Sequence, residues 1–273
     1  MAGALAWREI KPLIGAEVLA DKAALLGGAH AGEMRELLEA RGVLVFRQAH
    51  FDDAEHIAFT RTLGAYEPDK PDGEVTPISI DPDGGSSARY TKASFFWHFD
   101  GYFNQVPVLA SIMRPLVLSE TGGETEFCNT YAAFDELPEA RKAQLGGLKA
   151  VHALAAAQLA VEPEPDYATF RKWQGVASST LPLVWRHRSG RKSLVIGNTA
   201  VGIVGMDPLE SLELLVFLRD WATQERFAYS HRWSPGDVVM WDNTGTLHRA
   251  TPYPPGSGRL MARTKLAGEE PFA

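Results

Sequence analysis

The sequence predicts a mainly β fold with flanking helices, and three observations support this prediction. Apolar stretches with the length of buried strands recur along the chain, above all in its second half. Stretches with helical spacing and capping residues lie in the first quarter of the chain and near position 210. Clusters of glycine, proline and aspartate separate them. We expect a jelly roll, also called a double-stranded β-helix, with helices packed on one side.

Capping residues indicate the first elements. Residues 31–41 have apolar side chains at helical spacing, and Gly42 supplies a left-handed cap. The apolar stretch Val43–Phe46 follows directly and is typical of a buried strand. Asp52 or the next residue can cap a second helix that runs to about Leu63.

The elements in the middle and at the end of the chain are predicted from the same signals. Pro138 and two glycines bracket a short helix over residues 139–145, and Asp207 caps a helix that continues to Trp221. Residues 150–164 indicate a loose helix or a flexible segment. The strands that we expect here cover residues 195–204, 227–233, 237–241 and 260–266.

A loop rich in proline, aspartate, glycine and serine covers residues 68–87. Long irregular segments in compact domains are usually functional or disordered. We therefore treat this loop as a candidate lid, and a merely mobile insertion is the alternative.

Composition predicts a cytoplasmic enzyme with one domain over residues 1–273. The net charge of −7 does not favour nucleic acid as a partner, and no stretch has the length and apolar character of a membrane segment. The one cysteine, Cys128, excludes an intramolecular disulfide, and we expect it to be a small buried apolar residue. The partner that we expect is a small molecule, and homo-oligomerisation stays open.

Two distant stretches contain candidate metal ligands. His98 and Asp100 are two positions apart, so in extended backbone they project to the same face while Phe99 points into the packing. His248 follows the predicted strand Val238–Trp241. Two imidazoles and one carboxylate can occupy one face of an octahedron and leave the other face free. That arrangement is expected of non-haem Fe(II) oxygenases, although an isolated His-x-Asp triplet also occurs by chance.

Two arginines strengthen this interpretation. Arg259 and Arg263 follow His248 at 11 and 15 positions, and in a strand both would face the same side. A buried guanidinium is costly unless an anion pairs with it. Two inward-facing arginines therefore imply two anionic groups, or one anion and a solvent-filled opening. The alternative is that both lie on a solvated edge face.

These motifs resemble the taurine and phenoxyacetate dioxygenase family, the TauD/TfdA group, over nearly the whole chain. The spacing from His98 to Thr125 and the spacing from His248 to the two arginines follow the family pattern. The stretches that resemble the family are residues 12–17, 42–47, 97–100, 122–127, 182–184, 190–194, 241–248 and 270–272.

The resemblance implies an Fe(II)- and 2-oxoglutarate-dependent dioxygenase. In such an enzyme dioxygen converts 2-oxoglutarate to succinate and CO2 while a substrate C–H bond is hydroxylated, and the product often fragments. Thr125 and Arg259 would hold the distal carboxylate of 2-oxoglutarate, and Arg263 would face an acidic group of the substrate. The residues that would bind iron are His98, Asp100 and His248.

Departures from the family pattern limit the choice of substrate. The taurine enzymes have a His-x-His pair where this chain has residues 64–69, so taurine is not expected. They also have an asparagine four residues before the first iron ligand, where Ser94 stands here. Aromatic residues near the ligands, including Tyr102 and Phe103, indicate a pocket for an apolar or aromatic body. We expect Arg263, Tyr102, Phe103 and Ser94 to bind a small organic acid.

Two other classes of protein remain as alternatives. A zinc-dependent hydrolase could use the same three ligands, but it would not need the anion-binding residues. A non-catalytic jelly-roll binding protein would not need an intact ligand set. The histidines His152, His187 and His231 could be proposed as other ligands, and for His187 and His231, which lie among arginines, we favour a surface or structural role.

Overall fold

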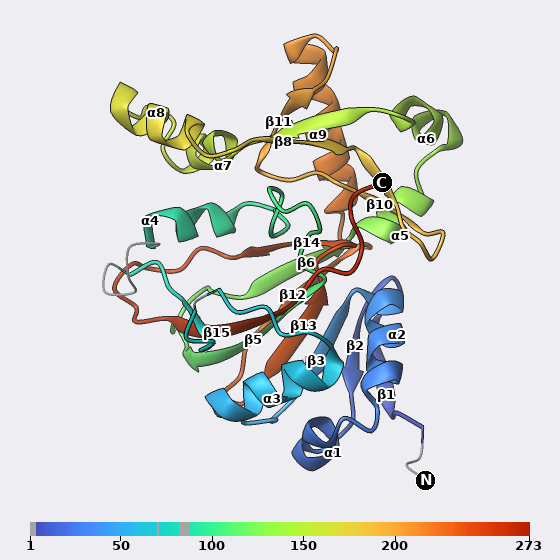
Figure 1. The fold of residues 1–273 in the computed structure, drawn as a ribbon, viewed down its shortest axis with the longest axis vertical. Coiled ribbons are helices and arrows are strands. Elements are labelled where there is room, and N and C mark those ends of the chain that lie inside the picture. Colours follow the sequence, from blue (N-terminus) through green and yellow to red (C-terminus); the bar gives the residue numbers. More distant parts are fainter. Residues whose placement is uncertain (1–3, 70, 82–87) are drawn as a thin grey trace.

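The computed structural model describes residues 4–69, 71–81 and 88–273, and two facing sheets form its centre (Figure 1). The larger sheet has the strand order β1-β2-β3-β13-β5-β15-β4, and the smaller sheet has the order β12-β6-β14. The larger sheet consists of β1 (Trp7–Lys11), β2 (Ile14–Val18), β3 (Val43–Phe46), β13 (Val238–Asp242), β5 (Ala110–Val117), β15 (Leu260–Leu266) and β4 (Thr76–Ile78). The smaller sheet consists of β12 (Ala228–His231), β6 (Thr125–Asn129) and β14 (Thr246–Ala250).

Alternate side chains of the larger sheet enter two different cores. On β3, Val43 and Val45 point toward the smaller sheet, where the ring of Phe127 lies 5.5 Å from that of Trp241. Leu44 belongs to the opposite core, with the helices. Burial of both faces explains why these strands are continuous apolar runs rather than alternating ones. The helices on this side are α1 (Lys22–Gly27), α2 (Ala31–Arg41) and α3 (Asp53–Leu63).

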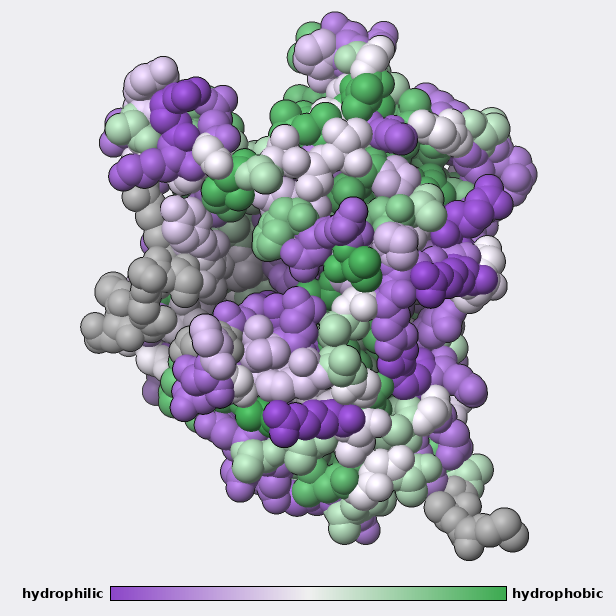
Figure 2. Space-filling model, viewed as in Figure 1, coloured by the Kyte–Doolittle hydropathy of each residue, from purple (hydrophilic) through white to green (hydrophobic). Residues whose placement is uncertain are grey.

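A further layer covers the outer face of the smaller sheet (Figure 1). Cys128 and Leu247 point into this layer, whereas Phe127 points the other way. The layer contains β7 (Lys149–His152), β8 (Ser179–Pro182), β11 (Ala200–Ile203), β9 (Val184–Arg186), β10 (Lys192–Leu194), α5 (Thr130–Asp135), α6 (Glu139–Leu145), α7 (Leu154–Val161), α8 (Tyr167–Gln174) and α9 (Pro208–Ala222). Figure 2 shows α7 and α8 standing away from the rest of the surface at the upper left.

The jelly-roll prediction is confirmed, but helices lie on both outer sides of the two sheets rather than on one. The predicted elements α2, β3, α3, α6, α9 and β15 are present, with a capping box at Asp52 and a positive φ of 72° at Gly42. Cys128 is fully buried, as expected. Among the described residues, none of the helices has both the length and the apolar character that a membrane span requires.

Three predictions about secondary structure need correction. Residues 195–204 do not form one strand, because the chain turns after β10 and passes closely over His98 before β11 begins. Residues 149–152 form strand β7, and only the part from 154 to 161 is helical. Part of the predicted loop over residues 68–87 is strand β4, paired with β15. Residues 70 and 82–87 of that loop lie outside the described residues.

A buried carboxylate ends β13. Asp242 is 4% exposed, and its Oδ1 accepts hydrogen bonds from the backbone N–H of Thr244 (2.8 Å) and from the hydroxyl of Thr244 (2.7 Å). Burial raises the pKa of Asp242 to about 6. The folded state therefore holds a proton that the unfolded chain releases near pH 3.8, and the stability contributed by this proton is lost as the pH rises through 6.

We expect Asp242→Asn to raise the free energy of unfolding at pH 8 by about 2 kcal/mol, because the amide oxygen keeps both hydrogen bonds and carries no charge. The difference from the wild type should shrink as the pH falls from 7 to 4. Urea unfolding at several pH values measures it, with the exposed Asp135→Asn as control. A constant difference across this range would contradict the assignment.

Candidate metal centre

The structure brings His98, Asp100 and His248 together. Their candidate ligand atoms all lie within 4.8 Å of one another. The backbone causes this convergence, because the N–H of His98 donates to the carbonyl of His248 (3.0 Å) and the N–H of His248 donates to that of His98 (2.8 Å). Opposed residues of an antiparallel bridge point to the same face. Phe99 is buried in the outer core, as the sequence predicts.

The surroundings of the two imidazoles suit metal binding. Nδ1 of His98 lies 2.9 Å from the carbonyl oxygen of Phe96, so Nδ1 carries the proton and Nε2 keeps its lone pair. Nε2 of His248 lies 3.8 Å from Oδ2 of Asp100. Two imidazole nitrogens and one carboxylate oxygen on a common face fit a divalent iron with free positions opposite.

The charges of these groups also suit a metal. Burial lowers the pKa of His98 and lowers the pKa of His248 further, so both rings are neutral near pH 7. Burial alone would raise the pKa of Asp100, but Arg263 and the two histidines outweigh it and hold this pKa well below its usual range. Neutral imidazoles and an ionised carboxylate are the forms that bind a cation.

Asn243, which the sequence analysis did not single out, fixes the loop that contains Asp100. Its Oδ1 accepts from the backbone N–H of Asp100 (2.8 Å), and its Nδ2 donates to the carbonyls of Asp100 (2.9 Å) and Val108 (3.0 Å). Asn243 is 3% exposed and directly follows β13. The carboxylate is therefore held relative to the larger sheet through its own backbone.

A second polar region lies where β6 and β15 begin. Arg259 is 3% exposed, donates to the carbonyl of Gly123 (2.8 Å) and has no acidic partner within 4.0 Å among the described residues. Its guanidinium lies 4.6 Å from the ring centre of Tyr253. A Cβ at Gly123 would lie 2.6 Å from Nε of Arg259, which explains the glycine there. A buried guanidinium without a carboxylate is a site for an anion.

Thr125 starts β6 and is 2% exposed. Its hydroxyl oxygen accepts a hydrogen bond from Nε1 of Trp233 (3.0 Å). An indole nitrogen can only donate, so the hydroxyl of Thr125 keeps its own proton for another acceptor. The sequence analysis missed Trp233, and only the pairing of β6 with β12 reveals its proximity.

Arg263 lies between two carboxylates. Its Nη1 is 3.0 Å from Oδ2 of Asp100, and its Nη2 is 3.2 Å from Oδ2 of Asp69. The side chain of Arg263 is 19% exposed. The alternative of a solvated edge face is therefore wrong for both arginines.

Comparison with known proteins identifies the family. The family model "Taurine catabolism dioxygenase TauD, TfdA family" matches residues 7–265. The chain belongs to this family. It is 33% identical over 269 residues to an alpha-ketoglutarate-dependent 2,4-dichlorophenoxyacetate dioxygenase of Burkholderia sp. (strain RASC), over 91% of this chain and 90% of that protein.

Two further relatives agree with the assignment to the TauD/TfdA family. A (S)-phenoxypropionate/alpha-ketoglutarate-dioxygenase of Sphingobium herbicidovorans is 32% identical over 277 residues, which cover 96% of this chain and 95% of that protein. The crystal structure of AAD-2 in complex with Mn(II) and N-oxalylglycine has a TM-score of 0.88 at 27% identity and covers 99% of this chain and 100% of that chain. The protein is accordingly a dioxygenase that uses Fe(II), 2-oxoglutarate and dioxygen, and neither a zinc hydrolase nor a non-catalytic binding protein.

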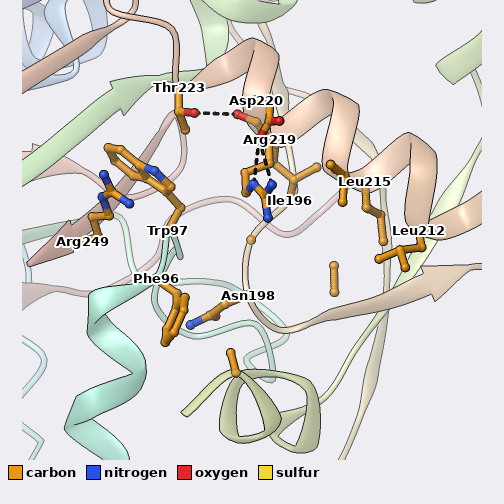
Figure 3. A pocket seen from close by; sticks show the side chains of 14 residues that line it. Phe96, Trp97, Ile196, Asn198, Leu212, Leu215, Arg219, Asp220, Thr223 and Arg249 are labelled. Carbon is orange, nitrogen blue, oxygen red and sulfur yellow. Dashed lines mark hydrogen bonds and ion pairs between the residues drawn. The ribbon is translucent and has the colours of Figure 1, made fainter. Parts of the chain in front are cut away.

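In this TauD/TfdA dioxygenase a cavity of about 490 Å³ is lined by Trp97 and Arg249, among others (Figure 3). Trp97 and Arg249 neighbour the two histidines in sequence, so their side chains project to the opposite face. In Figure 3 they line one side of the cavity, and Leu212 and Leu215 of α9 line another. The cavity and the candidate metal ligands therefore lie on opposite sides of strand β14.

The remaining predicted residues have different environments. Ser94 is half-buried in the short helix η2 (Lys92–Phe95), which follows α4 (Ala88–Thr91). Tyr102 is 6% exposed, and its ring lies 5.2 Å from that of Phe103, which is 60% exposed. The alternative ligands His152, His187 and His231 are buried and hydrogen-bonded within the protein, so they have structural positions rather than surface ones.

We expect Asn243→Ala to raise the dissociation constant for Fe(II) about tenfold, because the backbone of Asp100 loses two hydrogen bonds and its link to the carbonyl of Val108. Anaerobic titration with Fe(II) measures this directly, without turnover. Asn129→Ala is the matched control, since Asn129 is equally buried but caps α5 and does not touch Asp100. Equal losses of affinity in both variants would indicate general destabilisation instead.

Proposed function

We propose that the protein hydroxylates a small organic acid with an apolar or aromatic body, and that His98, Asp100 and His248 hold the iron. The observation that supports this most is the shared face of these three residues. Arg259, which has no acidic partner among the described residues, is buried nearby. Bound iron supplies the activation of dioxygen, with conversion of 2-oxoglutarate to succinate and CO2.

The distal carboxylate of 2-oxoglutarate fits the polar region at Arg259 and Thr125. The guanidinium offers charge-assisted hydrogen bonds that fix the position of a carboxylate, and a lysine could not reproduce its planar fork. The hydroxyl of Thr125 can add a third donor, because Trp233 already occupies its oxygen. These residues bind and orient the cosubstrate.

The substrate belongs at Arg263, with Ser94, Tyr102 and Phe103 as further candidates for its pocket. The two curated relatives act on aryloxy acids, according to their names, which supports a carboxylate attached to an aromatic ether. Hydroxylation of the carbon between the ether oxygen and the carboxylate gives a hemiacetal. It collapses to a phenol and an oxo-acid, so that hydroxylation also cleaves the substrate.

We further infer one domain over residues 1–273, a cytoplasmic location and a small molecule as partner. The loop over residues 68–87 stays a predicted lid. Homo-oligomerisation also stays an open prediction. Strand β4 of this loop pairs with β15, and Tyr66, just before the loop, also bridges to β15. Because Arg263 lies on β15, these contacts support a position of the loop next to the substrate.

The proposed function is tested by succinate formation from 2-oxoglutarate with Fe(II), dioxygen and a panel of aryloxyacetates, aryloxypropionates and alkyl sulfates. We expect at least one acid to increase turnover and to be consumed in equal amount. Arg263→Ala should raise KM for that acid at least tenfold while KM for 2-oxoglutarate changes little. If KM for every acid were unchanged, Arg263 would not bind the substrate.

We expect Trp233→Phe to raise KM for 2-oxoglutarate about fivefold and to leave KM for the acid nearly unchanged, because Thr125 loses the donor that orients its hydroxyl. Arg259→Lys should have a larger effect in the same direction. Steady-state kinetics with each component varied separates the two constants. Trp221→Phe, a change of a tryptophan on α9, serves as control, and an equal effect there would argue against a role of Trp233.

A further inference from the structure

Two cationic side chains on β15 share one carboxylate. Arg263 and Lys265 are two positions apart on this strand, and both reach Asp69. Nζ of Lys265 lies 2.5 Å from Oδ1 of Asp69, and Nη2 of Arg263 lies 3.2 Å from Oδ2. Each oxygen of Asp69 thus contacts a different cation, which is how a bound carboxylate ligand would also use the pair.

Backbone contacts place Asp69 at this position. It lies between α3 and β4, in a segment that is tied to β15 on both sides. The N–H of Glu67 donates to the carbonyl of Lys265 (3.0 Å), and Thr76 pairs with Arg263 in the sheet. The hydroxyl of Thr76 also donates to Oδ2 of Asp69 (2.6 Å). The carboxylate therefore meets the cations as part of a folded segment.

The side chains of Asp69, Arg263 and Lys265 differ in their exposure to solvent, and the carboxylate is the most exposed of the three. The side chain of Asp69 is 27% exposed, that of Arg263 is 19% exposed and that of Lys265 is 11% exposed. Burial alone would raise the pKa of Asp69, but Arg263, Lys265 and Thr76 lower it, so the group is ionised near pH 7. An anion that arrives from solvent finds both cations already paired.

We propose that Asp69 is an internal counter-anion of the substrate site, which an acidic substrate must displace from Arg263 and Lys265. The inference rests on the proposed function, which places the acid of the substrate at Arg263, and it adds Lys265 as a second cation of the site. The site then selects substrates by charge. A monoanion replaces Asp69, whereas a second negative charge on the substrate is repelled by Asp69 nearby.

Asp69 could compete with the substrate or could only position Arg263, and these two roles predict opposite changes in the affinity for an acid when Asp69 is replaced. If Asp69 competes with the substrate, Asp69→Asn removes the competitor and strengthens binding of an acid. If Asp69 only positions Arg263, the same change weakens binding. If Asp69 competes with the substrate, the ammonium of Lys265 contacts the substrate anion directly in the wild-type complex. Lys265→Met removes this contact and should therefore weaken binding.

The experiment is isothermal titration of the full-length protein, loaded with Mn(II) and N-oxalylglycine so that no turnover occurs. The probes are 2,4-dichlorophenoxyacetate, (S)-phenoxypropionate and the neutral 2,4-dichlorophenoxyacetamide. We expect the dissociation constant of the two acids to fall about fivefold in Asp69→Asn and in Asp69→Ala, and to rise about fivefold in Lys265→Met. The amide should show no such change. Glu136→Gln, which removes a carboxylate from a surface pair with Arg226, is the matched control.

Weaker or unchanged binding of both acids in Asp69→Asn and Asp69→Ala would overturn the proposal. The same holds if the amide responds as the acids do, since charge would then not be the cause. If neither acid binds to the wild type or to any variant, the counter-anion proposal and the substrate class both fall. Iron-dependent conversion of 2-oxoglutarate to succinate, measured on the same preparations, would still show whether the dioxygenase activity stands.

Discussion

The candidate metal centre depends on two backbone hydrogen bonds between His98 and His248. They join the segment before the larger sheet's β5 to the smaller sheet's β14, so that both imidazoles point to one face. The chain also passes close to His98 at Gly197, where a Cβ would lie 3.2 Å from Cα of His98. This contact leaves the segment that contains His98 little room to move. The geometry of the ligands is thus set by main-chain contacts, and the side chains need little freedom to bind a metal.

The two arginines of the site differ in their charged partners. Arg259 has no acidic partner among the described residues and therefore suits a dicarboxylate, of which one end stays away from the metal. Arg263, by contrast, lies between Asp100 and Asp69. The charge of Arg259 is therefore available to a bound anion, whereas the charge of Arg263 is compensated by carboxylates of the protein. The difference fits the proposal that Arg259 holds 2-oxoglutarate and that an acidic substrate displaces Asp69 from Arg263.

Much of the fold and the candidate metal ligands could be predicted because their signals are local. Because His98 and Asp100 are two residues apart, the sequence predicted that they share one face. The capping residues Asp52 and Gly42 predicted where helices begin and end. The partners of these residues could not be predicted in the same way. Trp233 meets Thr125 through strand pairing, and Asp69 meets Arg263 through a loop folded back on β15.

Such contacts depend on register and on loop paths, which hydrophobic periodicity does not contain. Residues 195–204 show this limit. Their apolar character predicted one strand, but a close approach to His98 at Gly197 interrupts it. On β14, His248 faces the interior and Arg249 the opposite side. Deleting a single residue from the turn after β13 would exchange these two faces. Under the proposed role of His248, the length of this turn is then constrained by iron binding, even where the sheet itself could re-form.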